Sequence, residues 1–369
     1  MVLSILRRTV SCNVVSSQRR YSSVNYLTAA LAKDSKPIEA PLYVKKKKST
    51  LAKQLRDKIE GLAISTKDLE TKFWLEGEDV FTPQEMNQAQ AFFNSADVEL
   101  EWTIGNYEEI PDVKYKRLDS KRKSTLDNLD AFSKTEYHEN LAKSRKTFGI
   151  APGLIRTLPE VLLLGNTNAG KSTLINNLLV KKNANKIADY AYVSKRAGFT
   201  KTLNCFNIGG KLRLVDSPGY GEFGDEDQGT LVLDYIQKRE RLAGALILID
   251  SEAGIREEDI NILSHLQENE IKHDVIFTKV DSVISKYYSR MNQLQKGSLD
   301  LEAFVEISKS YNDRIINHFE KSIESLPYSQ RVFFSNSMTN KYTKTLSGYK
   351  QIRVAILQNC NQFQIPEEF

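Results

Sequence analysis

The chain has 369 residues, a formal net charge of +5 and three cysteines. This length can hold one α/β domain of ordinary size together with an extension. The cysteines, Cys12, Cys205 and Cys360, lie far apart, which excludes a disulfide framework and a zinc-ligand spacing. No apolar run approaches the roughly 20 residues that a bilayer-spanning helix needs, so we expect no membrane span.

The first 33 residues contain no aspartate or glutamate but four arginines and many serines. This composition is typical of a mitochondrial transit peptide, and Arg19-Arg20-Tyr21 resembles a processing site of that pathway. A disordered basic tail that binds RNA would share the composition, but we favour import. We therefore expect residues 1–33 to be a transit peptide and the protein to reside in the mitochondrial matrix.

Residues 34–156 carry no strong motif, and we expect a partly helical extension with linkers. The run Lys45–Lys48 is a solvated tether or a contact to RNA phosphates, which lysine binds without choosing sequence. Pro83 marks a helix start, and Val98–Trp102 alternates as a strand does.

The segment GNTNAGKS, Gly165–Ser172, follows the apolar run Val161–Leu164 and precedes an amphipathic helix. A glycine loop in this setting turns backbone N–H groups toward phosphate oxygens, and the helix start adds its positive dipole. Lys171 supplies charge for the β- and γ-phosphates, and Ser172 offers a hydroxyl to Mg²⁺. The expected phosphate-loop residues are Gly165, Asn166, Thr167, Asn168, Ala169, Gly170, Lys171, Ser172 and Thr173.

A polar segment with a glycine hinge, Ser194–Thr200, comes next. Thr200 can contact Mg²⁺ and the γ-phosphate only while a γ-phosphate is present, so the loop is expected to order with triphosphate. An ordinary turn is the alternative for so short a string. The expected nucleotide contacts here are Gly198, Phe199, Thr200, Lys201 and Thr202.

Leu203–Ile208 and Lys211–Val215 are expected to be two strands of a hairpin joined by Gly209-Gly210. The second strand leads into Asp216, Ser217, Pro218 and Gly219. Asp216 can hold a water on Mg²⁺, and the Gly219 amide can reach the γ-phosphate.

Further strands are expected at Ala245–Asp250 and Val275–Phe277, with a helix at about Ile255–Glu268 between them. The second strand leads into Thr278, Lys279, Val280 and Asp281. The Asp281 carboxylate can accept from N1–H and the exocyclic amine of guanine, a donor pair that adenine lacks. Lys279 would lay its stem over the base.

The end of the chain supplies three more elements. Residues 282–310 are expected to form a helical hairpin or a surface for RNA or protein. A strand at Arg331–Phe334 leads into Ser335, Asn336 and Ser337, whose backbone N–H groups could contact guanine O6. A last helix, about Ser347–Asn359, presents an apolar stripe to the sheet.

The strings GNTNAGKST, AGFTKTLNCF, RLVDSPGYG, LVLDYIQKRERLAG with ALILIDSEAG, and TKVD resemble the EngB-type GTPases of the TrmE–Era–EngA–EngB–septin group. The resemblance covers roughly the last three-fifths of the chain. It implies a P-loop G domain at 157–369, built on a mostly parallel, doubly wound α/β sheet. It also implies that the strand near 98–102 can join this domain across an insertion of about residues 112–152.

The resemblance further implies GTP and GDP as ligands, Mg²⁺ held at Ser172, Thr200 and Asp216, and catalytic roles for Lys171, Thr200 and Gly219. Family members act in assembly of the large ribosomal subunit, and eukaryotic members are typically mitochondrial. The expected partner is thus the precursor of the mitochondrial large subunit, with its RNA and proteins, and the expected state is a monomer.

Several positions depart from the family pattern. Thr278 replaces an asparagine, and Phe199 occupies the place of an arginine. Tyr220 stands where Ras-like proteins place a water-orienting glutamine, so hydrolysis is expected to be slow until stimulated. Asn168 resembles an asparagine that helps to hold K⁺ in related GTPases; it either does so here or only stabilises the loop.

Two alternatives to the assembly switch stay open. A GTPase coupled to tRNA modification, as in the TrmE branch, would need a folate-binding or catalytic domain that is not evident in the sequence. A nucleotide-stabilised scaffold with little turnover is permitted by the missing glutamine.

Overall fold

The computed structural model describes residues 62–74, 81–128, 135, 140, 147–180, 190–191, 201–221, 226–294, 301–327 and 331–363. All of them belong to the unit Ile59–Phe369. The expected transit peptide, the run Lys45–Lys48 and the loop Ser194–Thr200 lie outside the described residues.

A seven-stranded sheet with the order β1-β3-β4-β2-β5-β6-β7 organises the domain. The strands are β1 (Val98–Ile104), β2 (Glu160–Gly165), β3 (Leu203–Ile208), β4 (Leu212–Asp216), β5 (Leu242–Asp250), β6 (His273–Thr278) and β7 (Val332–Phe334). β1 and β3 are antiparallel to their neighbours, whereas β4, β2, β5, β6 and β7 run parallel. This is the mostly parallel α/β sheet that the sequence predicted, and it includes a strand from the segment before residue 157.

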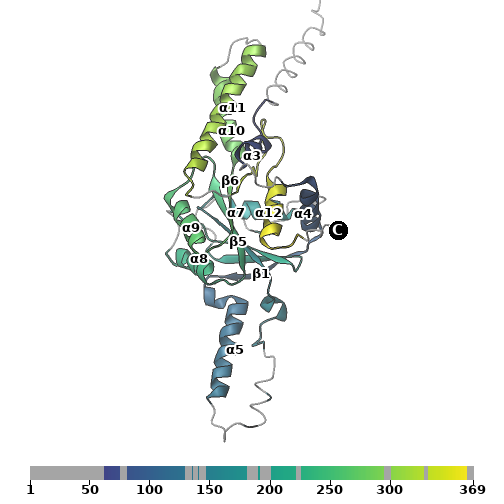
Figure 1. The fold of residues 1–369 in the computed structure, drawn as a ribbon, viewed down its shortest axis with the longest axis vertical. Helices are drawn as coiled ribbons and strands as arrows, with labels where there is room; N and C mark the ends of the chain where they lie inside the picture. The colour runs from purple at the N-terminus through teal and green to yellow at the C-terminus, as the bar shows by residue number, and fades with distance from the viewer. Residues whose placement is uncertain are drawn as a thin grey trace, which may run out of the picture. The chain divides into compact units, whose positions relative to one another are not determined.

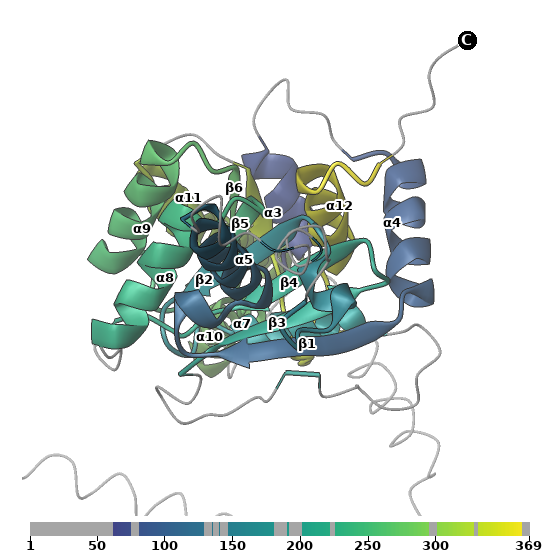
Figure 2. The same cartoon turned by 90° about the horizontal axis from the view of Figure 1, so that it is seen from below.

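Helices cover both faces of this sheet. The helices of the described residues are α3 (Thr66–Phe73), α4 (Pro83–Ser95), α5 (Pro111–Asp127), α7 (Lys171–Leu179), α8 (Glu226–Lys238), α9 (Glu257–Glu268), α10 (Val280–Leu294), α11 (Leu301–Glu324) and α12 (Tyr349–Asn359), with short 3₁₀ helices η1 (Tyr107–Glu109) and η2 (Pro152–Ile155). Figure 2 shows α8 and α9 on one side of the sheet and α4 and α12 on the other. α10 and α11 run side by side (Figure 1), forming the helical hairpin expected within residues 282–310.

The alternation of side chains along β2 explains why the sheet needs helices on both faces. Leu162 and Leu164 belong to the core beneath α8 and α9, and Val161 and Leu163 to the core beneath α7 and α12. All four are fully buried. A strand buried on both faces reads as a continuous apolar run, which is the pattern that placed it in the sequence.

The hairpin between β3 and β4 closes through Gly209 and Gly210, with φ angles of 59° and 65°. Lys211 N donates to Ile208 O at 3.1 Å. Two successive positive φ angles define a type I′ turn, whose twist matches that of the strands. The predicted two-residue turn is therefore confirmed.

A buried ionic network fixes the end of β2 that lies away from the phosphate loop. The Glu160 carboxylate accepts from Arg239 Nε at 2.7 Å and from Arg239 Nη2 at 2.6 Å. Arg239 Nη1 donates to both carboxylate oxygens of Asp112 at 2.9 Å. Arg213 Nε donates to Glu101 at 2.5 Å, and its Nη1 lies 3.5 Å from Glu160. One cluster thus joins β1, α5, β2, β4 and the end of α8.

We predict that Glu160→Gln destabilises the protein by about 3–5 kcal/mol, because two buried guanidinium groups lose their shared carboxylate. Urea unfolding measures this. Glu240→Gln is the matched control, since Glu240 pairs with Lys116 at 2.5 Å where both side chains are more than half exposed. Such exposed pairs contribute little, so the control midpoint should hardly move. Equal losses in the two variants would contradict the assigned role of Glu160.

The edge strand β7 is covered by α3. The rings of Phe73 and Phe334 lie 5.8 Å apart, and Gln351 Nε2 donates to Glu70 Oε2 at 3.0 Å. Burial raises the pKa of Glu70 from 4.5 to about 8, although the Phe334 N–H and the charge of Lys67 oppose the rise. Glu70 therefore stays protonated in the folded protein at neutral pH.

The folded state keeps the Glu70 proton up to about pH 8, whereas the unfolded chain releases it near 4.5, so stability falls as the pH rises between these values. Glu70→Gln keeps the shape and removes this titration. We predict that the variant is more stable than the wild type at pH 8, by about 4 kcal/mol, and that the gap closes below pH 4.5. Melting temperatures across this range test it; a gap independent of pH would refute the assignment.

Candidate functional site

The phosphate loop connects β2 to α7 through positions that require unusual backbone angles. Gly165 has φ 151°, and a Cβ there would lie 2.6 Å from Leu248 O. Gly170 caps α7 with φ 99°, and Asn168 has φ 65°. The glycine spacing that the sequence showed thus has a steric cause. The loop lies at the carboxyl ends of the parallel strands, the edge where open α/β sheets bind ligands.

Lys171 lies folded beneath this loop. Its Nζ donates to Gly165 O at 2.7 Å and to Asn166 O at 3.1 Å. Burial lowers the pKa of Lys171 to about 8, and the carboxylates of Asp216 and Asp259 act in the opposite direction. A buried ammonium at the start of a helix forms a centre of positive charge, which suits a polyphosphate.

The two described residues expected at the metal lie in contact. Ser172 Oγ donates to Asp216 Oδ2 at 2.9 Å. Burial raises the pKa of Asp216 to about 6, opposed by Lys171 and Ser172. Asp216 Oδ1 is buried without a hydrogen-bond partner in the described part of the chain. An unpaired carboxylate oxygen beside a hydroxyl fits a hard cation that keeps some of its waters, as Mg²⁺ does. The third expected ligand, Thr200, lies outside the described residues.

The segment after Asp216 is paired with the phosphate loop. Thr167 N donates to Tyr220 O at 3.0 Å, and a Cβ on Gly219 would lie 2.8 Å from Thr167 Cα. Only glycine allows this approach. Ser217 Oγ donates to Leu163 O at 2.6 Å, so Ser217 anchors the segment to β2.

Tyr220, which stands where Ras-like proteins place a water-orienting glutamine, is hydrogen-bonded to a side chain of α9. Tyr220 OH donates to Asp259 Oδ1 at 2.8 Å. Burial raises the pKa of Tyr220 well above its usual range, and the Asp259 charge adds to the rise. Asp259 lies in the first turn of α9 and had no sequence signal beyond its helix.

The segment after β6 reaches the phosphate loop directly. Thr278 Oγ1 donates to Ala169 O at 2.7 Å and lies 3.3 Å from Ile249 O. The threonine hydroxyl therefore joins two parts of the site that are 109 residues apart. Lys279, with φ 55°, donates from Nζ to Asp250 Oδ2 at 2.7 Å, a partner that the sequence had not indicated.

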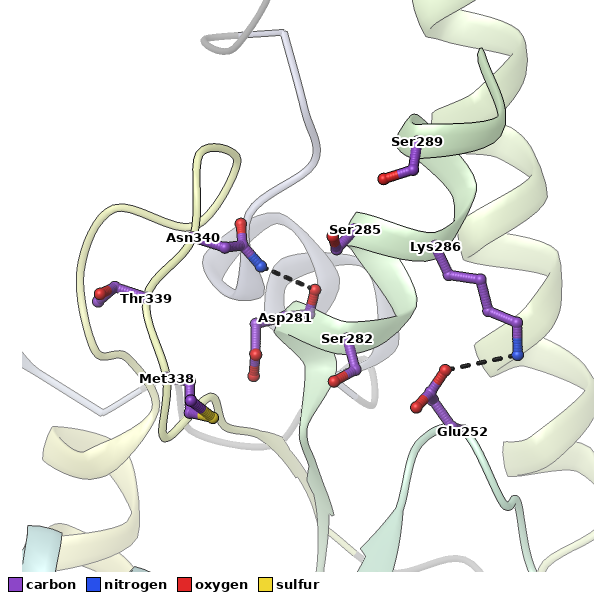
Figure 3. A pocket seen from close by; sticks show the side chains of 9 residues that line it. All are labelled: Glu252, Asp281, Ser282, Ser285, Lys286, Ser289, Met338, Thr339 and Asn340. Carbon is purple, nitrogen blue, oxygen red and sulfur yellow. Dashed lines mark hydrogen bonds and ion pairs between the residues drawn. The ribbon is translucent and has the colours of Figure 1, made fainter. Parts of the chain in front are cut away.

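Asp281 lines a cavity of about 410 Å³ between the start of α10 and the loop after β7 (Figure 3). Burial raises the pKa of its carboxyl group, opposed by its own backbone N–H and by Lys279. The other lining residues are Glu252, Ser282, Ser285, Lys286, Ser289, Met338, Thr339 and Asn340. Asn340 Nδ2 donates to Asp281 O at 3.1 Å. The residues expected from the sequence ended at Ser337 and did not include this part of the lining.

The expected loop Ser335–Ser337 lies next to Asp281. Ser335 N donates to Phe277 O at 2.8 Å, and Val280 N donates to Ser335 O at 3.3 Å. The side chain of Asn336 is fully buried and holds the loop itself, donating to Met338 O at 2.9 Å and to Thr345 O at 3.0 Å. From the sequence, only the backbone N–H groups of this loop were expected to take part in binding, through contact with guanine O6.

A glycine loop that opens a helix, a serine–aspartate pair beside it and a buried aspartate at a neighbouring strand end define a P-loop GTPase. The family model described as a 50S ribosome-binding GTPase matches residues 160–279. The chain is 30% identical over 294 residues to MIOREX complex component 8 of Saccharomyces cerevisiae, covering 78% of this chain and 80% of that protein. It is 33% identical over 155 residues to the probable GTP-binding protein EngB of Limosilactobacillus reuteri, covering 41% and 76%.

The chain therefore belongs to the EngB family of GTPases, whose members bind GTP or GDP together with Mg²⁺. The alignment with a solved structure of a probable GTP-binding protein engB has 18% identity and a TM-score of 0.35, and it covers 55% of this chain and 100% of that one. Among the described residues, no helix is both long and apolar enough to cross a membrane.

The hydrogen bond from the Thr278 hydroxyl to Ala169 O can be tested by substitution. Thr278→Val removes the donor to Ala169 O while keeping the shape, so the phosphate loop loses its link to the base side of the site. We expect GDP affinity to fall about fivefold to tenfold, the value of one net hydrogen bond, and Thr278→Ser to retain it. Calorimetric titration with GDP measures both. Unchanged affinity in the valine variant would show that the link is dispensable.

Proposed function

We propose that the protein is a GTP-controlled switch in the assembly of the large ribosomal subunit of mitochondria. The observation that carries the proposal is the position of Asp281, in a cavity beside β6 that Thr278 ties to the phosphate loop. A carboxylate there accepts from the two donors on the Watson–Crick edge of guanine, and adenine would leave it unpaired. In this proposal Lys279 covers the base and the Ser335–Ser337 backbone meets O6.

The nucleotide cycle follows from the groups around the phosphates. Lys171 and the loop N–H groups hold the β- and γ-phosphates, while Ser172 and Asp216 hold Mg²⁺ and its water. Thr200 and the Gly219 amide respond to the γ-phosphate, so their loops order with GTP and loosen after hydrolysis. The ordered loops form the surface that docks on a ribosomal precursor, and hydrolysis releases it.

Intrinsic hydrolysis is slow in this proposal. The Tyr220 hydroxyl is engaged by Asp259, which supports a tyrosine that does not orient the attacking water. A K⁺ ion near Asn168 could offset charge in the transition state. The same tyrosine contact favours, as a second candidate, a nucleotide-stabilised scaffold with little turnover. GTP turnover with K⁺ and with Na⁺ separates the two candidates, since only the switch requires stimulated hydrolysis.

The proposed ribosomal partner is supported by the relatives, and the proposed mitochondrial compartment by the composition of residues 1–33. The matching family model is described as ribosome-binding, and relatives include EngB. The acid-free, arginine-containing residues 1–33 favour import into mitochondria, and the matrix is where a mitochondrial ribosomal precursor would be met.

Asp281→Asn tests the choice of base. Xanthine carries a carbonyl oxygen where guanine has its 2-amino group, so an asparagine amide can donate to it. We expect the variant to lose at least tenfold in GDP affinity and to gain affinity for XDP, because each mispaired buried polar group costs about 1–3 kcal/mol. Competition binding with the two diphosphates measures this. If GDP bound equally well to both forms, guanine would not sit at Asp281.

Sedimentation tests the ribosomal partner. We expect tagged protein from lysed mitochondria to migrate with large-subunit precursors in the presence of a non-hydrolysable GTP analogue and to move to the top of the gradient with GDP. Even spreading across the gradient with both nucleotides would remove the ribosomal proposal.

A further inference from the structure

Thr66, the first residue of α3, is bonded to the loop that follows β7 through a chain of side-chain hydroxyls. We propose that Thr66 is a positioning residue for nucleotide binding, acting through Ser347 and Asn336 on the loop that closes over the base. The inference rests on the proposed placement of guanine between Asp281 and this loop.

The contacts form one directed chain. Thr66 Oγ1 donates to Ser347 Oγ at 2.7 Å. Ser347 Oγ in turn donates to Asn336 Oδ1. Thr66 and Asn336 are 6% and 0% exposed, so both ends of the chain are shielded from competing water, while Ser347 between them is half-buried. Hydrogen bonds arranged head to tail in a dry setting strengthen one another.

Asn336 is the point where this chain controls the loop. Its oxygen receives the chain, and its nitrogen donates to Met338 O and Thr345 O. Met338 lines the Asp281 cavity, and Asn340 of the same loop donates to Asp281 O. Without the Thr66 donor, the Ser347 hydroxyl can rotate away from Asn336 Oδ1. The Asn336 amide can then turn, and the loop wall of the cavity loses two of its bonds.

The residues just before Thr66 are held by the helical hairpin. Ile64 N donates to Asn312 Oδ1 at 3.0 Å, and Asn312 Nδ2 donates to Leu62 O at 2.8 Å. Tyr288 OH also donates to Asn312 Oδ1, at 2.7 Å. Residues 62–66 thus bridge α10 and α11 to the base loop, while Asp281 lies in the first turn of α10.

Two consequences follow from this bridge. Docking of α3 should slow the release of guanine nucleotide. Because coupling between two binding events is reciprocal, bound nucleotide should also hold the residue 62–66 segment in place. Any partner that displaces the segment would then promote nucleotide exchange.

Thr66→Val is the test, because it removes the hydroxyl and keeps the volume. We expect GDP dissociation, followed by fluorescence of a labelled GDP in stopped flow, to become about fivefold faster, the equivalent of one net hydrogen bond. Thr66→Ser should restore the wild-type rate. Thr71→Val is the matched control on the same helix, since the exposed Thr71 donates only to Lys67 O within α3.

The outcomes separate a positioning role from a structural one. Faster GDP release in Thr66→Val alone, with melting temperatures of the two nucleotide-free valine variants alike, supports the proposal. Equal release rates in Thr66→Val and wild type overturn it, as does equal acceleration by Thr71→Val. If Thr66→Val does not fold, Ser347→Ala interrupts the same series of hydrogen bonds. The same acceleration of GDP release is then expected of Ser347→Ala, and a wild-type rate would overturn the proposal.

Asp281→Asn distinguishes this inference from the proposed function. If that variant loses GDP affinity while Thr66→Val releases GDP normally, only the role of Thr66 is wrong. If Asp281→Asn binds GDP as the wild type does, guanine is not where we place it and both proposals fall.

Discussion

The position of the phosphate loop depends on one buried carboxylate at the far end of its strand. Glu160 begins β2 and is shared by the guanidinium groups of Arg213 and Arg239, with a further hydrogen bond from the Tyr235 hydroxyl. Through these arginines it reaches Glu101 on β1 and Asp112 on α5, so the segment before residue 157 is bound into the GTPase domain. Removing one partner of such a cluster leaves an uncompensated charge in a dry environment. The central strand is thereby held at one end, and the glycine loop begins at the other.

At that other end, short polar side chains connect the parts of the site. The Thr278 hydroxyl bonds the loop carbonyl of Ala169, the Ser172 hydroxyl bonds Asp216, and Gly219 packs against Thr167. Each contact joins segments that follow different strands, because parallel strands bring their carboxyl ends to one edge. The proposed phosphate, metal and base sites are therefore joined by direct contacts. Thr278 stands where the family pattern has an asparagine. Its single hydroxyl, in place of an amide, makes the hydrogen bond to the phosphate loop.

The sequence predicted what local rules determine. Gly165 marks a loop because a side chain there would meet Leu248 O, and Gly170 because its φ angle is positive. Gly209-Gly210 marks a type I′ turn, and the continuous apolar run of β2 marks a strand buried on both faces. The sequence could not reveal the Glu160 cluster, the Tyr220–Asp259 bond or the Thr66–Ser347–Asn336 chain. Their bonded members are 11 to 281 residues apart and have no periodic signature, since such buried polar contacts are recognisable only once the partners meet. The cavity lining at Met338 and Asn340 was also missed, because it is formed by a loop of ordinary composition.

The most direct test of the account is a calorimetric comparison of GDP, IDP and ADP on the full chain with Mg²⁺. Hypoxanthine keeps the N1–H of guanine but lacks the 2-amino group, so it isolates one of the two hydrogen bonds assigned to Asp281. The account predicts that IDP binds about tenfold more weakly than GDP and ADP more weakly still, because each unpaired buried polar group costs about 1–3 kcal/mol. Equal affinities for the three diphosphates would contradict it.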